Sequence, residues 1–180
     1  MQPFKLPTMI DFKLFKSGNK TIHKCSLIIG ILLSSTLLFA QNPTNFSGVW
    51  AFDVSKSNAG EGGSFPYSNI VYTIKQNPVS ISIETTTFRE GSENIVRTEV
   101  FNLDGKEQTE KNDYSSTKKL ATWSQDKKIL TLTTIMTVDS KDYRDDAVYK
   151  ISDNGRTLTV QNLFKNPTGE STVIQVFNKK

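Results

Sequence analysis

Residues 69–84 read NIVYTIKQNPVSISIE, the clearest alternation of apolar and polar residues in the chain. Ile70, Tyr72 and Ile74 fall on one face of an extended segment, because successive side chains of a β-strand point to opposite faces. After a turn at Asn77-Pro78, the apolar residues of 79–84 alternate in the same way. The stretch therefore predicts two antiparallel strands joined by a tight turn, each with one apolar face.

Further β-rich segments, separated by turn residues, continue this pattern along the chain, which is typical of a sandwich or barrel. Besides an opening strand around residue 50, the expected strands cover residues 69–76, 79–84, 95–103, 115–124, 129–138, 142–151, 157–164 and 171–178. Links this short imply antiparallel neighbours, and closure into a barrel removes exposed sheet edges. We therefore predict an all-β fold: an antiparallel barrel of eight or nine strands, preceded by a helical signal peptide.

The first 40 residues have the layout of a secretory signal. A basic stretch ending at Lys24 precedes an apolar run, and Ala40 is a small residue before the polar Gln41. The run from Cys25 to Ala40 is shorter than the roughly 20 apolar residues of a bilayer span. We therefore expect cleavage near Ala40 and export to the periplasm or the extracellular space, with membrane contact only through an uncleaved leader. Residues 41–180 form the expected barrel domain, and translation starts at Met1 or Met9.

The net charge of +4 has its origin in this leader. Five of the 22 basic residues and one of the 18 acidic residues precede residue 41, so 17 of each remain. The lysine pairs Lys118-Lys119 and Lys127-Lys128 suit solvated hairpin ends. A neutral domain lacks the positive field that nucleic-acid binding requires. We expect no nucleic-acid partner.

Residues 41–180 contain neither histidine nor cysteine, because His23 and Cys25 both lie in the leader. Imidazole-dependent nucleophiles and zinc or copper sites are therefore excluded from the domain. Asp142 and Asp146 share one face of a strand and Asp145 the other, which indicates a solvated hairpin end rather than a metal site. We expect no catalytic residue, metal or cofactor. An isomerase or hydrolase that uses tyrosine or carboxylate groups remains as a weaker alternative.

The opening strand reads Asn45-Phe46-Ser47-Gly48-Val49-Trp50. It resembles the N-F-x-G-x-W signature of lipocalins and related calycin barrels, including bacterial secreted lipocalin-like proteins. The resemblance implies that Trp50 packs across the closed end of the barrel and that Gly48 permits close approach of the neighbouring backbone. Alternation then places Phe52 and Val54 inside. Lipocalins usually carry an arginine near the last strand that covers this tryptophan, whereas no arginine follows Arg156 here.

A lipocalin-like barrel is just wide enough to hold one small ligand or to be filled by side chains. For a cavity, Tyr72 and Tyr149 would orient a ligand through their hydroxyl groups. The expected apolar contacts are Ile83, Phe101, Met136 and Phe164. Val96 and Val100 alternate with Phe101 and are also apolar, so the pattern does not decide which face of this strand points inwards. The glycine-rich residues 60–64 are either a mouth loop or a plain loop.

Two functions follow from these observations. The first is non-catalytic binding of a small apolar ligand inside the barrel of an exported protein. The second is a packed barrel that acts as a protein-interaction or inhibitor module in the cell envelope. The sequence leaves the oligomeric state open.

Overall fold

The computed structural model describes residues 42–180, which form a single antiparallel sheet of ten strands. The strands are β1 (Gly48–Phe52), β2 (Ile70–Gln76), β3 (Ser80–Thr87), β4 (Ile95–Asn102), β5 (Gln108–Lys111), β6 (Ser115–Trp123), β7 (Ile129–Val138), β8 (Lys141–Ile151), β9 (Thr157–Asn166) and β10 (Gly169–Lys179). The all-β, antiparallel prediction is confirmed. The expected signal peptide lies outside the described residues, and within them no helix is long and apolar enough to cross a membrane.

The strand count is ten rather than eight or nine. The additional strand is β5, a polar segment of four residues that pairs with β6. Its sequence, QTEK, has no apolar face, so hydrophobic alternation gave no sign of it. Lys118 and Lys119 lie within β6 and not at a hairpin end, whereas Lys127 does lie in the turn between β6 and β7.

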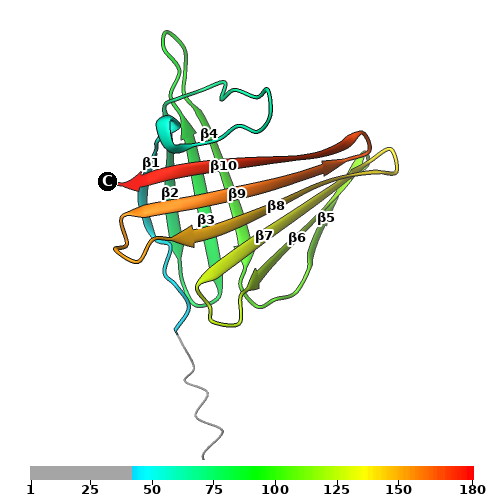
Figure 1. Ribbon diagram of the computed structural model, residues 1–180. Helices are drawn as coiled ribbons and strands as arrows, with labels where there is room; N and C mark the ends of the chain where they lie inside the picture. The colour runs from blue at the N-terminus through cyan, green and yellow to red at the C-terminus, as the bar shows by residue number, and fades with distance from the viewer. Residues whose placement is uncertain (1–41) are drawn as a thin grey trace, which may run out of the picture. The chain divides into compact units, whose positions relative to one another are not determined.

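The sheet curls into a nearly closed barrel. Its order is β4-β3-β2-β1-β10-β9-β8-β7-β6-β5, so the first and last strands of the chain pair in the middle. β1–β4 run across the direction of β6–β10, and the two groups face one another (Figure 1). The edge strands β4 and β5 are not paired with each other, but Asn102 N donates a 3.0 Å hydrogen bond to Gln108 Oε1 at this junction.

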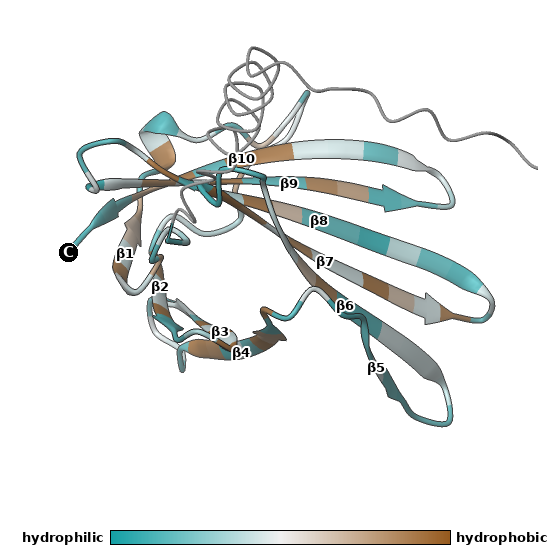
Figure 2. Cartoon of the chain, turned by 90° about the horizontal axis from the view of Figure 1, so that it is seen from below, coloured by the Kyte–Doolittle hydropathy of each residue, from teal (hydrophilic) through white to brown (hydrophobic). Residues whose placement is uncertain are grey.

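The apolar core lies where these two groups of strands cross. Phe46 and Trp50 are completely buried there, together with three residues of the opposite group: Leu130, Leu158 and Phe177. Towards their far ends β8 and β9 become hydrophilic (Figure 2). The sheet is therefore densely packed at one end of the barrel and opens at the other, which we call the mouth.

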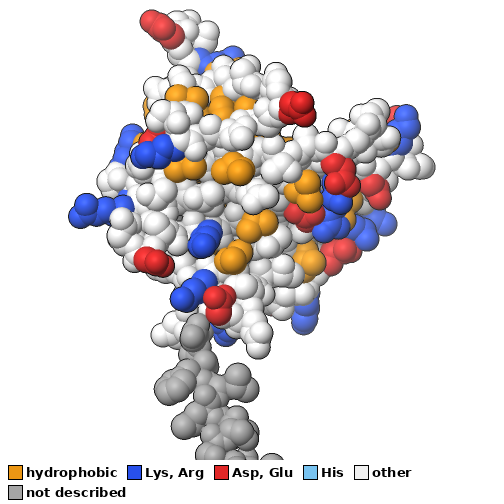
Figure 3. All heavy atoms as spheres, in the orientation of Figure 1, with side chains coloured by type: hydrophobic (Ala, Val, Ile, Leu, Met, Phe, Trp, Pro, Cys, Tyr) orange, Lys and Arg blue, Asp and Glu red, His pale blue; other side chains and the backbone are white. Residues whose placement is uncertain are grey.

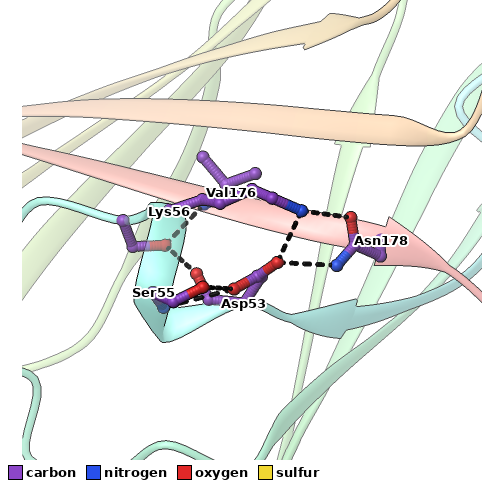
Figure 4. Close-up of polar contacts among 6 residues, drawn as sticks. Asp53, Ser55, Lys56, Val176 and Asn178 are labelled. Atoms are coloured by element: carbon purple, nitrogen blue, oxygen red, sulfur yellow. Dashed lines mark hydrogen bonds and ion pairs between the residues drawn. The ribbon is translucent and has the colours of Figure 1, made fainter.

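The alternation expected beyond β1 stops at Phe52. Phe52 packs against the core as predicted, but Val54 begins a short 3-10 turn, Val54–Lys56, and is exposed, so its predicted inward position is wrong. The turn forms because the Asp53 side chain accepts a hydrogen bond from Ser55 N and caps it. Asp53 also pairs with Lys56 at 2.8 Å and accepts a 2.9 Å hydrogen bond from Asn178 on β10 (Figure 4).

The chain after this turn remains attached to β10. Asn58 and Ile174 exchange two backbone hydrogen bonds of 2.8 Å, and Val176 N donates to the Ser57 hydroxyl. The glycine-rich residues 60–64 follow this bridge and lead to Phe65, whose ring contacts that of Phe52 at 5.0 Å. The loop is therefore anchored at its start to the barrel wall.

Candidate functional site

The six residues predicted to bind ligand share one face of the sheet. The strand registers are regular, so residues of equal parity along a strand lie on the same face. We call the face that carries the core residues Trp50, Leu130 and Phe177 the inner face. It also carries Tyr72, Ile83, Phe101, Met136, Tyr149 and Phe164. Phe101 therefore points inwards, and Val96 and Val100 point out and are exposed.

The structure divides these six residues into two groups. Ile83, Phe101 and Tyr149 are buried in the core, and the Tyr72 ring stacks on Phe177 at 4.3 Å. By contrast, Met136 is 42% exposed and Phe164 is 38% exposed, because they lie farther along β7 and β9 than the core extends. The prediction that all six surround one enclosed cavity is therefore too simple.

Met136 and Phe164 belong to an exposed group at the mouth. Tyr143 pairs directly with Met136 across β7 and β8, and Phe164 pairs with Asp145, two residues from Tyr143. Diagonal neighbours of this kind are within reach of aromatic side chains. Tyr143 is also 42% exposed. We call Met136, Tyr143 and Phe164 the mouth strip.

A small cavity of about 110 Å³ lies between the mouth strip and the core. It is lined by Glu99, Phe101, Leu132, Thr134, Asp145, Ala147 and Tyr149. Its walls thus come from β4 on one side and from β7 and β8 on the other. The volume is below the roughly 300 Å³ at which small-molecule pockets begin. An entire drug-sized ligand therefore does not fit there, but one end of a ligand does.

The cavity contains two carboxyl groups without a counter-charge. Neither Glu99 nor Asp145 belongs to any of the ion pairs formed by the described residues. Asp145 Oδ1 is buried and has no hydrogen-bond partner among residues 42–180. Burial and the negative charges of Glu99 and Asp146 raise the pKa of Asp145 to about 6. Burial is also the main cause that raises the pKa of Tyr72 and of Tyr149, so both stay protonated.

The neighbouring acid, Asp146, is on the outer face, as alternation predicts. It accepts hydrogen bonds of 2.6 and 2.8 Å from Arg144 and one of 2.6 Å from Thr133. Acidic and basic side chains are intermingled on this side of the molecule (Figure 3), where Lys165 also pairs with Glu170 at 2.8 Å. Within residues 42–180 no group of three or more acidic residues is arranged to hold a metal ion.

Glu99 and Asp145 line the cavity but were not among the residues predicted to bind a ligand. Glu99 shares the parity of Phe101, and Asp145 that of Tyr149, so alternation alone places both carboxylates on the inner face. Their approach to one another depends on the crossing of β4 over β8, which no local pattern encodes.

The loop between β1 and β2 also contributes to the mouth. Tyr67 lies over the inner face of β3 and β4, where it lines a hollow of about 270 Å³ with Thr85, Thr87, Ile95 and Arg97. Of the two interpretations of residues 60–64, this position suits a mouth loop.

The closed end of the barrel matches the expectation for Trp50. Its indole N–H donates a 3.0 Å hydrogen bond to Phe46 O, and Lys179 Nζ lies 5.2 Å from the ring centre. A lysine of the last strand thus stands over the tryptophan. Gly48 adjoins these side chains and not backbone: a Cβ there would lie 3.2 Å from Lys179 Cε and 3.4 Å from the indole nitrogen.

Comparisons with known proteins add a likeness of fold. No family model matches the chain, and no curated protein matches it. Among solved structures, it is similar to zebrafish ileal bile acid-binding protein complexed with cholic acid, with a TM-score of 0.48 and 19% sequence identity. The match covers 76% of this chain and 100% of that chain. Any conclusion about function therefore depends on this chain's own residues.

Proposed function

We propose that this protein binds a small ligand with a large apolar part at the mouth of its barrel. The apolar part would lie against the mouth strip, and one end would enter the cavity beside Phe101 and Tyr149. The observation that carries the proposal is the exposure of Met136, Tyr143 and Phe164 next to one another on the inner face. Neighbouring exposed apolar side chains of this kind mark binding sites, whereas single ones do not.

We further propose that the protein is exported and acts without catalysis. The leader supports export, since residues 1–40 have the basic, apolar and small-residue order of a signal peptide. The lack of histidine and cysteine after residue 41 supports a binding role, because the common nucleophile and general-base pairs need one of them. Two carboxyl groups at a cavity are also compatible with acid–base chemistry, which makes turnover a necessary control in any binding assay.

The small volume of the cavity favours a second candidate, the packed barrel that binds a partner protein. In that case the mouth strip would contact a protein surface and would not hold a small molecule. Binding of a simple alkyl probe separates the two candidates, since a flat protein-binding surface gives such a probe no enclosed contact.

The test is titration of the protein with 1-decanol, followed through the NMR signal of the Met136 methyl group. We expect saturable binding that Phe164→Gln weakens about five-fold or more, because burial of an aromatic side chain against an alkyl chain is lost. Val100→Thr removes an exposed apolar side chain from the outer face of β4 and should leave binding unchanged. Shifts that do not saturate up to the solubility of decanol would overturn the proposal in favour of the packed barrel.

A further inference from the structure

The cavity below the mouth strip offers hydrogen-bond acceptors for which the described residues supply no donor. Asp145 Oδ1 is buried and unpaired, and Glu99 forms neither an ion pair nor a hydrogen bond with residues 42–180. A buried acceptor without a partner costs free energy, and a charged one costs more than a neutral one. Something from outside residues 42–180 would relieve this cost.

Tyr149 contributes a third polar group to the cavity. The residue is only 5% exposed and lines the cavity, yet its hydroxyl forms no hydrogen bond with any described residue. Among the described residues, Asp145 Oδ1 is the fully buried side-chain atom without a partner, whereas Tyr149 belongs to the lining of the cavity. Three polar groups from β4 and β8 thus converge on one small space without bonding to one another.

The basic side chains nearby are engaged elsewhere or are absent from the lining of the cavity. Lys119 is on the inner face of β6 but pairs with Glu110 at 3.2 Å. Arg144 is on the outer face of β8 and pairs with Asp146 at 2.6 Å. Arg97 lies two residues from Glu99 on β4, but it lines the separate hollow beneath Tyr67. Within residues 42–180, no basic side chain therefore pairs with the negative charge of the cavity.

We propose that the cavity receives a primary ammonium group at the end of an apolar chain, held by the carboxylates of Glu99 and Asp145 and by the Tyr149 hydroxyl. This inference rests on the proposed function, since the apolar chain would occupy the mouth strip. An ammonium group has three N–H donors, which matches three converging acceptors. The cavity of about 110 Å³ has room for roughly three or four atoms of water size, enough for the nitrogen and the adjacent carbons.

The same geometry predicts which head groups are rejected. A carboxylate would be repelled by Glu99 and Asp145. A trimethylammonium group has the right charge but no N–H donor, so it leaves Asp145 Oδ1 unpaired. A phosphoethanolamine group carries an anionic phosphate next to its ammonium, which places negative charge beside the two carboxylates. The inferred ligand is therefore an amphiphilic primary amine and not a phospholipid.

The experiment compares decylamine, decanol, decanoate, decyltrimethylammonium and decylphosphoethanolamine by calorimetric titration at about pH 8, each below its micellar concentration. All five carry the same alkyl chain, so differences in affinity report the head group. We expect decylamine to bind at least about ten-fold more tightly than decanol, because hydrogen bonds to charged groups are stronger than those to neutral ones. The other three should bind more weakly than decylamine.

Two variants connect this preference to the cavity. Glu99→Gln and Asp145→Asn keep the shape of each side chain and remove its charge, and the double variant should bind decylamine and decanol about equally. Glu84→Gln is the matched control, since Glu84 neighbours Ile83 on β3 but points to the outer face. Glu99 is exposed, so its single variant tests the inference even where a change at Asp145 disturbs folding.

Each outcome has a distinct meaning. If none of the five probes binds, the proposed function itself is wrong. If decanol binds as tightly as decylamine, or if the preference for decylamine survives in the double variant, the barrel binds apolar chains, but the cavity holds only water and the inference is overturned. A preference for decanoate or decylphosphoethanolamine would overturn it equally.

Discussion

Asp145 is the residue whose surroundings differ most from those its sequence neighbours suggest. It follows an exposed arginine and precedes a salt-bridged aspartate, yet its own side chain enters the interior. Its pKa of about 6 lies above the ordinary 3.8, so the folded protein holds this proton more tightly than the unfolded chain. The stability that results is fully present below about pH 4 and is lost as pH rises through 6.

Asp145→Asn should therefore raise the free energy of unfolding at pH 8, on the order of 1 kcal/mol for a group that solvent partly reaches. At pH 3.5 the same substitution should have little effect, because both the carboxylic acid and the amide are neutral there. Urea denaturation of both proteins across this pH range measures the difference. If a bound cation already neutralised Asp145, the substitution would instead lower the free energy of unfolding at pH 8.

Trp50 is the second residue on which the fold depends. It is completely buried and its indole N–H bonds to Phe46 O, so Trp50→Ala leaves both a cavity and an unpaired carbonyl. We expect a loss of about 3–5 kcal/mol in the free energy of unfolding, measured by urea denaturation. Tyr114→Ala, at an aromatic residue that is 87% exposed, should change it by less than about 0.5 kcal/mol. Equal effects of the two substitutions would show that Trp50 does not fill the closed end.

At the scale of single elements, the start of β1 depends on Gly48. Its φ of +149° is a backbone conformation that side chains disfavour, and a Cβ would press on Lys179 Cε. Gly169, at the start of β10, has a similar φ of +153° but open space around it. Both Gly→Ala substitutions should destabilise the protein by about 1 kcal/mol through the backbone, and Gly48→Ala by more because of its contacts. The difference in stability between the two variants, measured by thermal unfolding, reports the contact of the new Cβ at position 48 with Lys179. Equal losses of stability would show that this contact is unimportant.

The segment from Asp53 to Asn58 is an element of another kind, because it extends the barrel wall without regular pairing. Hydrogen bonds from Lys56, Ser55 and Asn178 hold the pKa of Asp53 well below its usual range, so the carboxylate that anchors this segment stays charged. Asp53→Ala should speed hydrogen exchange at the amides of residues 53–58 and of Ile174.

Asp126→Ala provides the control for this prediction. Asp126 likewise accepts hydrogen bonds within a turn, from Ser124 and Lys128, but that turn joins β6 and β7. Its loss should change exchange only around residues 124–129. An unchanged exchange rate at Asn58 in Asp53→Ala would show that the backbone bridge to Ile174 suffices without the carboxylate.

For the whole molecule, packing at one end and opening at the other predict a gradient of local stability. Amides in the half of β8 around Tyr149 lie over the core, whereas those around Asp142 lie at the exposed hairpin. Because local opening is easier where few apolar contacts are buried, exchange should be much slower at 147–151 than at 141–144. Mass spectrometry of exchanged peptides measures this, and uniform protection along β8 would contradict an open mouth. A bound amphiphile should reduce the difference in exchange rate between the two halves of β8.

The sequence by itself determined every strand except β5 and the face of most strands, and the resemblance of residues 45–50 to the lipocalin signature indicated the burial of Trp50. These properties are local: alternation with period two separates inner from outer residues, and turn residues mark the ends. This is why alternation places Tyr72 and Tyr149 on the apolar faces of their strands, whereas the face of Phe101 was settled only by the pairing of β3 with β4. The tenth strand, β5, was not predicted, because it is stabilised by pairing with β6 and not by an apolar face.

Only the tertiary structure decided which inner residues meet. The crossing of β1–β4 over β6–β10 brings Glu99 to Asp145, although 45 residues separate them in sequence, and leaves Met136 and Phe164 beyond the core. Alternation with period two specifies the face on which a residue lies, but not its position between the closed end and the mouth. Whether a residue at a given position is buried depends on how far the opposite strands extend. The carboxylates, and the chemistry we infer from them, therefore became visible only when the two halves of the sheet were placed face to face.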